Sequence, residues 1–115
     1  MEIKCRIWIE KDGKHVLGKG GAEILKALEK YKSLSKAAKH VGMSYRFAWM
    51  YINRIEENTG VKIVERERGG KGGGKMTLTE NGKKLLKMYE DAEKVCEDAI
   101  KNLNYKKEFN LYKDQ

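Results

Sequence analysis

The 115-residue sequence contains no proline, only two cysteines and no long apolar run. Cys5 and Cys96 have neither metal-site nor redox-motif spacing, and two isolated cysteines do not predict a disulfide-rich secreted protein. No apolar stretch approaches the roughly 20 residues that span a membrane, and the N-terminus lacks the apolar core of a signal peptide. We therefore expect a cytoplasmic protein with no membrane partner and no metal site.

The sequence also lacks a recognisable catalytic set of nucleophile, base and orienting group. Residues 69–75, GGKGGGK, nearly fit the phosphate-binding loop of nucleotide hydrolases. The match fails because Met76 stands where Ser or Thr must bind magnesium, because a strand is expected to follow, and because the preceding strand is charged. His15 has no other metal ligand near it in the sequence and is expected to be structural or exposed. We predict that the protein is not an enzyme and needs no cofactor.

Positive charge is concentrated in the middle of the chain. The sequence has 25 basic and 17 acidic residues, a net charge of +8. Residues 31–78 hold 10 basic and 4 acidic residues, whereas residues 79–115 hold 8 of each. A basic block of this kind is typical of a face that binds phosphates. A Lys-rich solvated surface is the alternative, but it would not predict a neutral C-terminal third.

A helix-turn-helix is predicted between residues 34 and 60. Ser35 is the expected N-cap of a short first helix, which ends at Gly42. Ser44 is the expected N-cap of a longer second helix that runs to about Thr59 and ends at Gly60. The residues expected to be buried are Ala37, Ala38 and Val41 in the first helix, and Ala48, Ile52 and Ile55 in the second.

The exposed face of the second helix carries large apolar side chains among hydrogen-bond donors. Its residues are Tyr45, Arg46, Trp49, Met50, Asn53 and Arg54. Such donors can bind base edges or phosphates, so this face predicts DNA binding. An ordinary amphipathic helix of a small helical domain is the alternative for this segment alone.

Strand patterns and one further helix flank the helix-turn-helix. Residues 3–10 alternate as a strand with one buried face, Asp12 and Gly13 form a turn signal, and residues 15–17 are the return strand. A helix is expected from Ala22 to about Tyr31 as the third helix of the bundle. The fold class is therefore mainly α with small β elements.

A second hairpin, the wing, is predicted after the helix-turn-helix. Residues 61–68 and 76–79 are its expected strands, and the glycine-rich residues 69–75 are its tip. Arg68, Lys71 and Lys75 are expected to pair with DNA phosphates, because glycine leaves no bulk that would prevent close approach.

One long helix is predicted over residues 79–103, with Thr79 as its N-cap. Its apolar residues are spaced 4, 3, 4, 3 and 4 apart, which is typical of helices that pack on helices: Leu85, Tyr89, Ala92, Cys96, Ala99 and Leu103. We predict that they form a homodimer interface; packing across the chain's own domain is the alternative. The expected organisation is a winged helix-turn-helix over 1–78, this dimerisation helix, and a tail over 104–115 without an assigned role.

Four motifs carry a family resemblance. They are IWIEKDG at 7–13, SKAAKHVGMSYRFAW at 35–49, RGGKGGG at 68–74 and LTENG at 78–82. With these motifs the chain resembles the N-terminal DNA-binding domain of the ModE family of molybdate-responsive regulators, a winged helix related to that of LysR-type regulators. The resemblance implies a major-groove role for Ser44, Tyr45, Arg46, Trp49, Asn53 and Arg54 and a backbone role for Arg68, Lys71 and Lys75. Ser35 is also expected to contact DNA.

The resemblance implies a sequence-specific regulator that binds double-stranded DNA as a homodimer, with molybdate, tungstate or other transport genes as candidate targets. Full-length members carry C-terminal molybdate-binding domains, and no such domain is expected in these residues. Whether this chain senses molybdate directly is therefore left open: constitutive action, response to another signal, and dependence on a separate effector-binding protein are the alternatives, and the small-molecule effector is unknown. Two other functions are open: an architectural DNA-binding protein with little sequence preference, and a winged-helix module that binds a protein.

Overall fold

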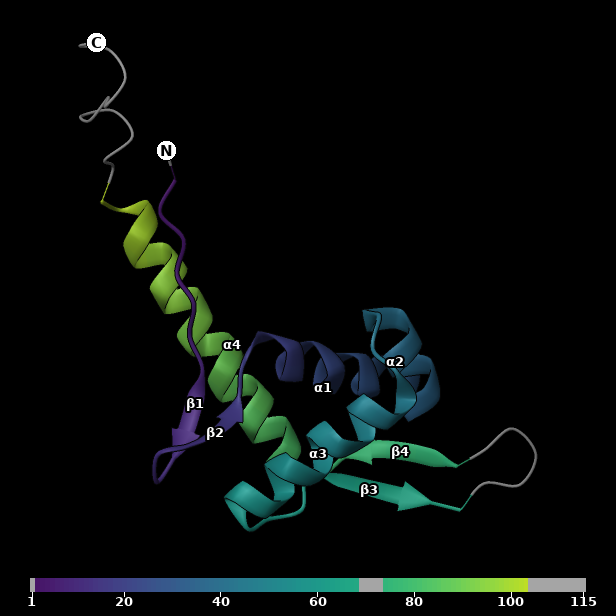
Figure 1. The fold of residues 1–115 in the computed structure, drawn as a ribbon. Coiled ribbons are helices and arrows are strands. Elements are labelled where there is room, and N and C mark those ends of the chain that lie inside the picture. The colour runs from purple at the N-terminus through teal and green to yellow at the C-terminus, as the bar shows by residue number, and fades with distance from the viewer. Residues whose placement is uncertain (1, 69–73, 104–115) are drawn as a thin grey trace.

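Figure 1 shows the computed structural model of the chain, which describes residues 2–68 and 74–103. Its elements are β1 (Ile9–Lys11), β2 (Lys14–Leu17), α1 (Lys19–Tyr31), α2 (Leu34–Val41), α3 (Tyr45–Thr59), β3 (Val64–Glu67), β4 (Lys75–Leu78) and α4 (Glu80–Lys101). The strands form two antiparallel hairpins, β1–β2 and β3–β4. The predicted fold class, a winged helix-turn-helix with an N-terminal hairpin and a long C-terminal helix, is confirmed. None of the helices in the described ranges is long and apolar enough to cross a membrane.

The core lies where α1 packs against α2 and α3. The fully buried side chains of α1 are Ile24, Leu25 and Leu28, and the buried stripe of α3 is Ala48, Ile52 and Ile55, as predicted. Helix α1 begins at Lys19, earlier than the predicted Ala22. A Cβ atom on Gly21 would lie 2.6 Å from side-chain atoms of Leu17 and Tyr51. Gly21 therefore belongs to the helix and allows close packing, although in sequence it resembles an interruption.

The helix-turn-helix has the predicted boundaries except at its first cap. The N-cap of α2 is Ser33, whose Oγ accepts a hydrogen bond from the backbone N–H of Lys36 at 3.2 Å, so the prediction of Ser35 is wrong. Capping at Ser33 makes Leu34 the first helical residue, and its side chain is buried in the core. Gly42 adopts the left-handed conformation at φ 79°, which ends α2 and allows the tight turn into α3.

Helix α3 is fixed at both ends by the predicted residues. The Ser44 Oγ accepts a hydrogen bond from the backbone N–H of Phe47 at 3.0 Å, and Gly60 is the left-handed C-cap. The predicted helix from Tyr45 to Thr59 is thereby confirmed.

The wing is held against the helical bundle by backbone hydrogen bonds. Its strands pair from Val64 with Leu78 to Glu67 with Lys75, a shorter hairpin than predicted. The Met76 N–H donates to the Lys32 carbonyl at 3.0 Å, and the Glu56 carboxylate of α3 accepts the Ile63 N–H at 2.9 Å. These contacts set the position of β3 and β4 relative to α3.

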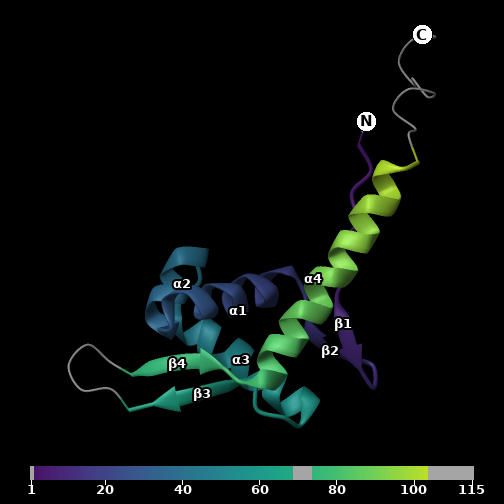
Figure 2. The same ribbon diagram turned by 180° about the vertical axis from the view of Figure 1, so that it is seen from behind.

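Helix α4 leaves the base of the wing and projects from the bundle beside the N-terminal segment, as Figures 1 and 2 show from opposite sides. Thr79 is its N-cap, as predicted. The strand predicted over residues 3–10 is wrong for most of its length, because only Ile9–Lys11 pairs with β2. Residues 4–10 alternate in burial nonetheless, with Cys5 and Ile7 half-buried, whereas Ile3 is exposed. When an extended segment packs one face against a helix, every second residue is covered, which gives the same period-two pattern as a strand.

Candidate nucleic-acid interface

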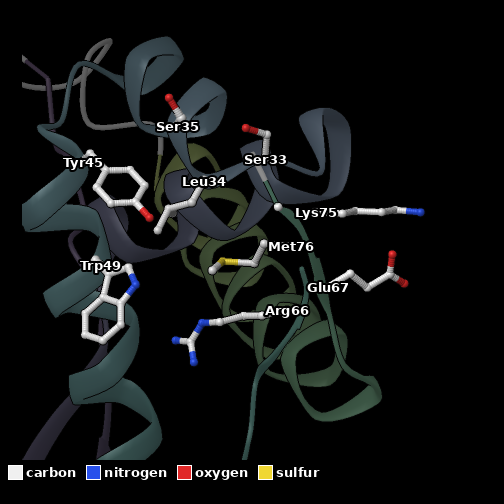
Figure 3. A pocket seen from close by; sticks show the side chains of 10 residues that line it. Ser33, Leu34, Ser35, Tyr45, Trp49, Arg66, Glu67, Lys75 and Met76 are labelled. Atoms are coloured by element: carbon white, nitrogen blue, oxygen red, sulfur yellow. The ribbon is translucent and has the colours of Figure 1, made fainter. Parts of the chain in front are cut away.

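Helix α3 presents its predicted polar and aromatic residues at the surface. Tyr45 and Trp49 are 55% and 41% exposed, although both are large aromatic side chains. They lie one helical turn apart on the side of α3 that faces the wing (Figure 3). Arg46, Met50 and Arg54 follow the adjoining exposed stripe at spacings of four residues. The face predicted to contact DNA is therefore accessible.

A groove of about 470 Å³ separates α3 from the wing. It is lined by Ser33, Leu34, Ser35, Tyr45, Trp49, Arg66, Glu67, Gly74, Lys75 and Met76. Leu34 and Met76 are buried and form its apolar floor, and the two serines come from the start of α2. Aromatic walls with hydroxyl and cationic groups at the rim can accommodate a sugar-phosphate chain beside a base edge.

Arg66 of β3 is a residue of this interface that the sequence analysis missed. Its guanidinium lies 5.2 Å from the centre of the Trp49 ring and donates a hydrogen bond to the Asn53 Oδ1 at 3.2 Å. In Figure 3 the Arg66 side chain points across the groove toward Trp49. Strand alternation could have identified Arg66. Residues two apart on a strand point to the same face, so Arg66 lies on the face of the buried Val64, which meets α3.

The remaining predicted DNA-binding residues lie around this groove. Ser35 is exposed at the start of α2, and the hydroxyl of Ser44 is engaged as the cap of α3. Arg68 and Lys75 are exposed on the wing, where Lys75 points away from the Trp49 side of the groove (Figure 3). Lys71 lies outside the described residues.

Within the described part of this interface, the cationic groups form no salt bridge. The salt bridges within residues 2–68 and 74–103 join Glu2 to Lys4, α1 to α4, and residues within α4. None of them involves a basic residue of α2, α3 or the wing. In the same ranges, no group of three or more His, Cys, Asp or Glu side chains is arranged to bind a metal ion.

The predicted dimer interface divides between two faces of α4. Tyr89 is only 3% exposed because it is buried in the chain's own fold, and Cys96 contacts Cys5 of the N-terminal segment. Ala92, Ala99 and Leu103 are exposed, and Leu85 is half-buried. A partner chain could therefore contact these four residues, whereas Tyr89 has almost no surface left to offer.

Two titratable groups near α4 have raised pKa values, for different reasons. The hydrogen bond with Cys96, together with desolvation and nearby carboxylates, raises the pKa of Cys5 to about 11. Burial raises the pKa of Tyr89 to about 12, and the neighbouring Glu93, which accepts a hydrogen bond from the Tyr89 hydroxyl at 3.2 Å, adds to the effect. Both groups therefore stay protonated and neutral near pH 7.

The bundle of α1, α2 and α3, the wing and the accessible face of α3 define a winged helix-turn-helix protein. Comparison with known proteins agrees: the family described as "Bacterial regulatory helix-turn-helix protein, lysR family" matches residues 21–83, more than half of the chain. The chain belongs to this family.

The relatives include the regulators that the sequence motifs suggested. The chain is 36% identical to the DNA-binding transcriptional dual regulator ModE of Escherichia coli over 77 residues, which cover 67% of this chain and 29% of that protein. It is 30% identical to the molybdenum transport protein ModE of Azotobacter vinelandii over 100 residues, 87% of this chain and 37% of that protein.

A third relative has a different name. The molybdenum-pterin-binding protein MopB of Rhodobacter capsulatus is 38% identical over 72 residues, 60% of this chain and 27% of that protein. The resemblance to ModE is confirmed, and the chain spans about a third or less of the length of these relatives.

Proposed function

We propose that the chain is a sequence-specific, double-stranded DNA-binding transcription regulator that acts as a homodimer. The observation that carries the proposal is the exposed face of α3, where Tyr45 and Trp49 border the groove beside the wing and Arg46 lies on the adjoining exposed stripe. A helix of this diameter fits the major groove, and its donors match base edges and phosphates. The concentration of basic residues over 31–78 supports the same partner.

The homodimer is proposed on a stripe of apolar residues along α4. The stripe consists of Leu85, Met88, Ala92, Val95 and Ala99 of α4, with Leu103 just beyond the end of the helix; Met88 is 57% and Val95 70% exposed. The spacing alternates between three and four residues along most of this stripe, which is the period of helices that pack on helices. Met88 and Val95 replace Tyr89 and Cys96 of the sequence-based prediction, because those two contact the chain's own fold. A second copy of the chain, with the same stripe, is the proposed occupant.

Two-fold symmetry then requires an inverted-repeat operator, with half-sites about one helical turn or a multiple of it apart. We propose molybdate, tungstate or other transport genes as targets, since relatives are named as a ModE regulator and as a molybdenum transport protein. The effector to which the dimer responds is left open in this proposal.

Selection from a random duplex library by the purified chain, at near-physiological salt, tests the DNA-binding function. Enrichment of an inverted repeat is the expected result. Retention of DNA without enrichment would replace the proposal with an architectural DNA-binding protein, and no retention would replace it with a protein-binding module. If Arg46 contacts a guanine, Arg46→Ala should cost about 1–3 kcal/mol of binding and relax preference at one base position.

The dimer is tested separately by Val95→Glu, which places a charge in the stripe. The variant should sediment as a monomer and lose preference for the inverted repeat. Lys101→Glu is the matched control, because it introduces the same side chain on α4 outside the stripe and should remain dimeric. A wild-type chain that is monomeric at tens of micromolar would contradict the proposed assembly.

A further inference from the structure

Arg66 connects the wing to α3 through two side chains at once. Its guanidinium covers the Trp49 ring at 5.2 Å and donates to the Asn53 Oδ1 at 3.2 Å. Trp49 and Asn53 are separated by one turn of α3, so a single planar group can reach both. Both contacts are made within the chain itself, so Arg66 can hold the two side chains together.

The hydrogen bond to Arg66 determines which part of the Asn53 amide is available. A guanidinium has only donors, so the amide atom that faces it must be the oxygen. The Nδ2 group of Asn53 is then the end that remains for a base. An asparagine that binds adenine in the usual bidentate way accepts from adenine N6 with Oδ1 and donates to N7 with Nδ2. Arg66 occupies one of the two lone pairs of Oδ1 and places its guanidinium beside that oxygen, so a second donor such as adenine N6 is disfavoured there and Asn53 is better suited to donate through Nδ2.

We propose that Arg66 is a positioning residue that sets base preference by presenting Asn53 as a hydrogen-bond donor. The inference rests on the proposed DNA-binding function and adds the chemistry of one contacted base. Guanine N7 and O6, and thymine O4, are acceptors in the major groove, whereas adenine presents a donor at N6 beside N7. The base opposite Asn53 is therefore guanine or thymine in preference to adenine.

The test compares base preferences of four chains in the same random-library selection: wild type, Arg66→Ala, Asn53→Ala and the double variant. Asn53→Ala identifies the base pair that Asn53 contacts, because preference is lost there. Arg66→Ala frees Oδ1 and should shift that same position toward adenine by about tenfold relative to guanine or thymine, within the range of one base contact. In the Asn53→Ala background, removal of Arg66 should produce no further shift at this position.

Lys62→Ala is the matched control for loss of positive charge. Lys62 is exposed and does not line the groove, so its removal should weaken binding to all sequences alike. If Arg66→Ala behaves like Lys62→Ala, or if its effect persists without Asn53, Arg66 is a general DNA contact and the inference is overturned. If Arg66→Ala does not fold by circular dichroism, Arg66→Met also lacks donors and replaces it.

A second readout does not depend on DNA. In a Trp8→Phe background, Trp49 is the only tryptophan, and Arg66→Ala should increase quenching of its fluorescence by acrylamide, because one ring face becomes uncovered. Unchanged quenching would overturn the Arg66 contact itself. A wild-type chain that enriches no motif would refute the proposed function, whereas a wild-type motif that Arg66→Ala leaves intact would refute only the role of Arg66.

Discussion

Beside the Arg66 contacts, one carboxylate joins α3 to the wing, and its removal gives a quantitative prediction. The Glu56 side chain accepts the Ile63 N–H at 2.9 Å and the Val64 N–H at 3.4 Å. Ile63 is completely buried, so Glu56→Ala leaves its N–H without this acceptor in a place that water does not reach easily. A hydrogen bond to a charged group contributes about 1.5–3 kcal/mol, and an unsatisfied buried donor costs about 1–3 kcal/mol.

The two free-energy ranges describe the loss of the same hydrogen bond, so they are not added. Because Glu56 is half-buried and the second bond is long, we expect Glu56→Ala to lower the free energy of unfolding by about 2 kcal/mol. Glu56→Gln keeps a neutral oxygen acceptor and should lose about half as much. With a urea m-value of about 1–2 kcal/mol/M for a chain of this size, the midpoint should fall by about 1–2 M.

Urea unfolding followed by circular dichroism measures this loss at a fixed protein concentration, since an oligomer's stability depends on concentration. Glu57→Ala is the control: it removes the same side chain from the next, exposed position and should change stability by less than about 0.5 kcal/mol. Equal effects of the two substitutions would refute the assignment of Glu56 as the wing anchor. A lower affinity of Glu56→Ala for DNA, measured under folding conditions, would follow from displacement of the wing.

Three further predictions concern the core and the N-terminal segment. Ile52→Ala removes a fully buried side chain between α1 and α3 and should cost about 2–5 kcal/mol in urea unfolding. The pKa of Tyr89 is raised to about 12 from an ordinary 10.0, so the folded state retains the phenolic proton more tightly than the unfolded state. This shift contributes stability that is complete below pH 10 and is lost as the pH rises toward 12. In Tyr89→Phe, the free energy of unfolding should therefore fall less between pH 9 and 11 than it does in the wild type. Because the pKa of Cys5 is raised to about 11, its alkylation by iodoacetamide at pH 8 should be slow. The reaction should be faster in Cys96→Ala, measured by peptide mapping, and an unchanged rate would contradict the contact between the two thiols.

Features with a local cause were predictable from sequence. The caps at Ser44, Gly42 and Gly60 depend on side-chain and backbone properties of single residues. The buried stripe of α3 follows from helical periodicity alone. The one misplaced cap, Ser35 for Ser33, arose because two serines precede the helix and only the packing of Leu34 distinguishes them.

Features that depend on partners far apart in sequence were not predictable. The alternation over residues 3–10 is real, but only the folded chain shows that half of it packs on α4 rather than on a strand. The apolar spacing of α4 is real as well, but Tyr89 is buried in the chain's own fold and Cys96 contacts Cys5 of the N-terminal segment. The spacing of apolar residues identifies which face of a helix or strand is buried, but it does not say which part of the chain covers that face.

The sequence by itself determined the helices, all of the predicted caps except the N-cap of α2, the basic middle of the chain and the family, because each of these is encoded in neighbouring residues or in motifs. Only the tertiary structure decided that Arg66 reaches Trp49 and Asn53, that Glu56 holds the wing, and which face of α4 stays exposed. These contacts join residues of different elements across the fold, and their geometry is set by how the helices and the wing pack together.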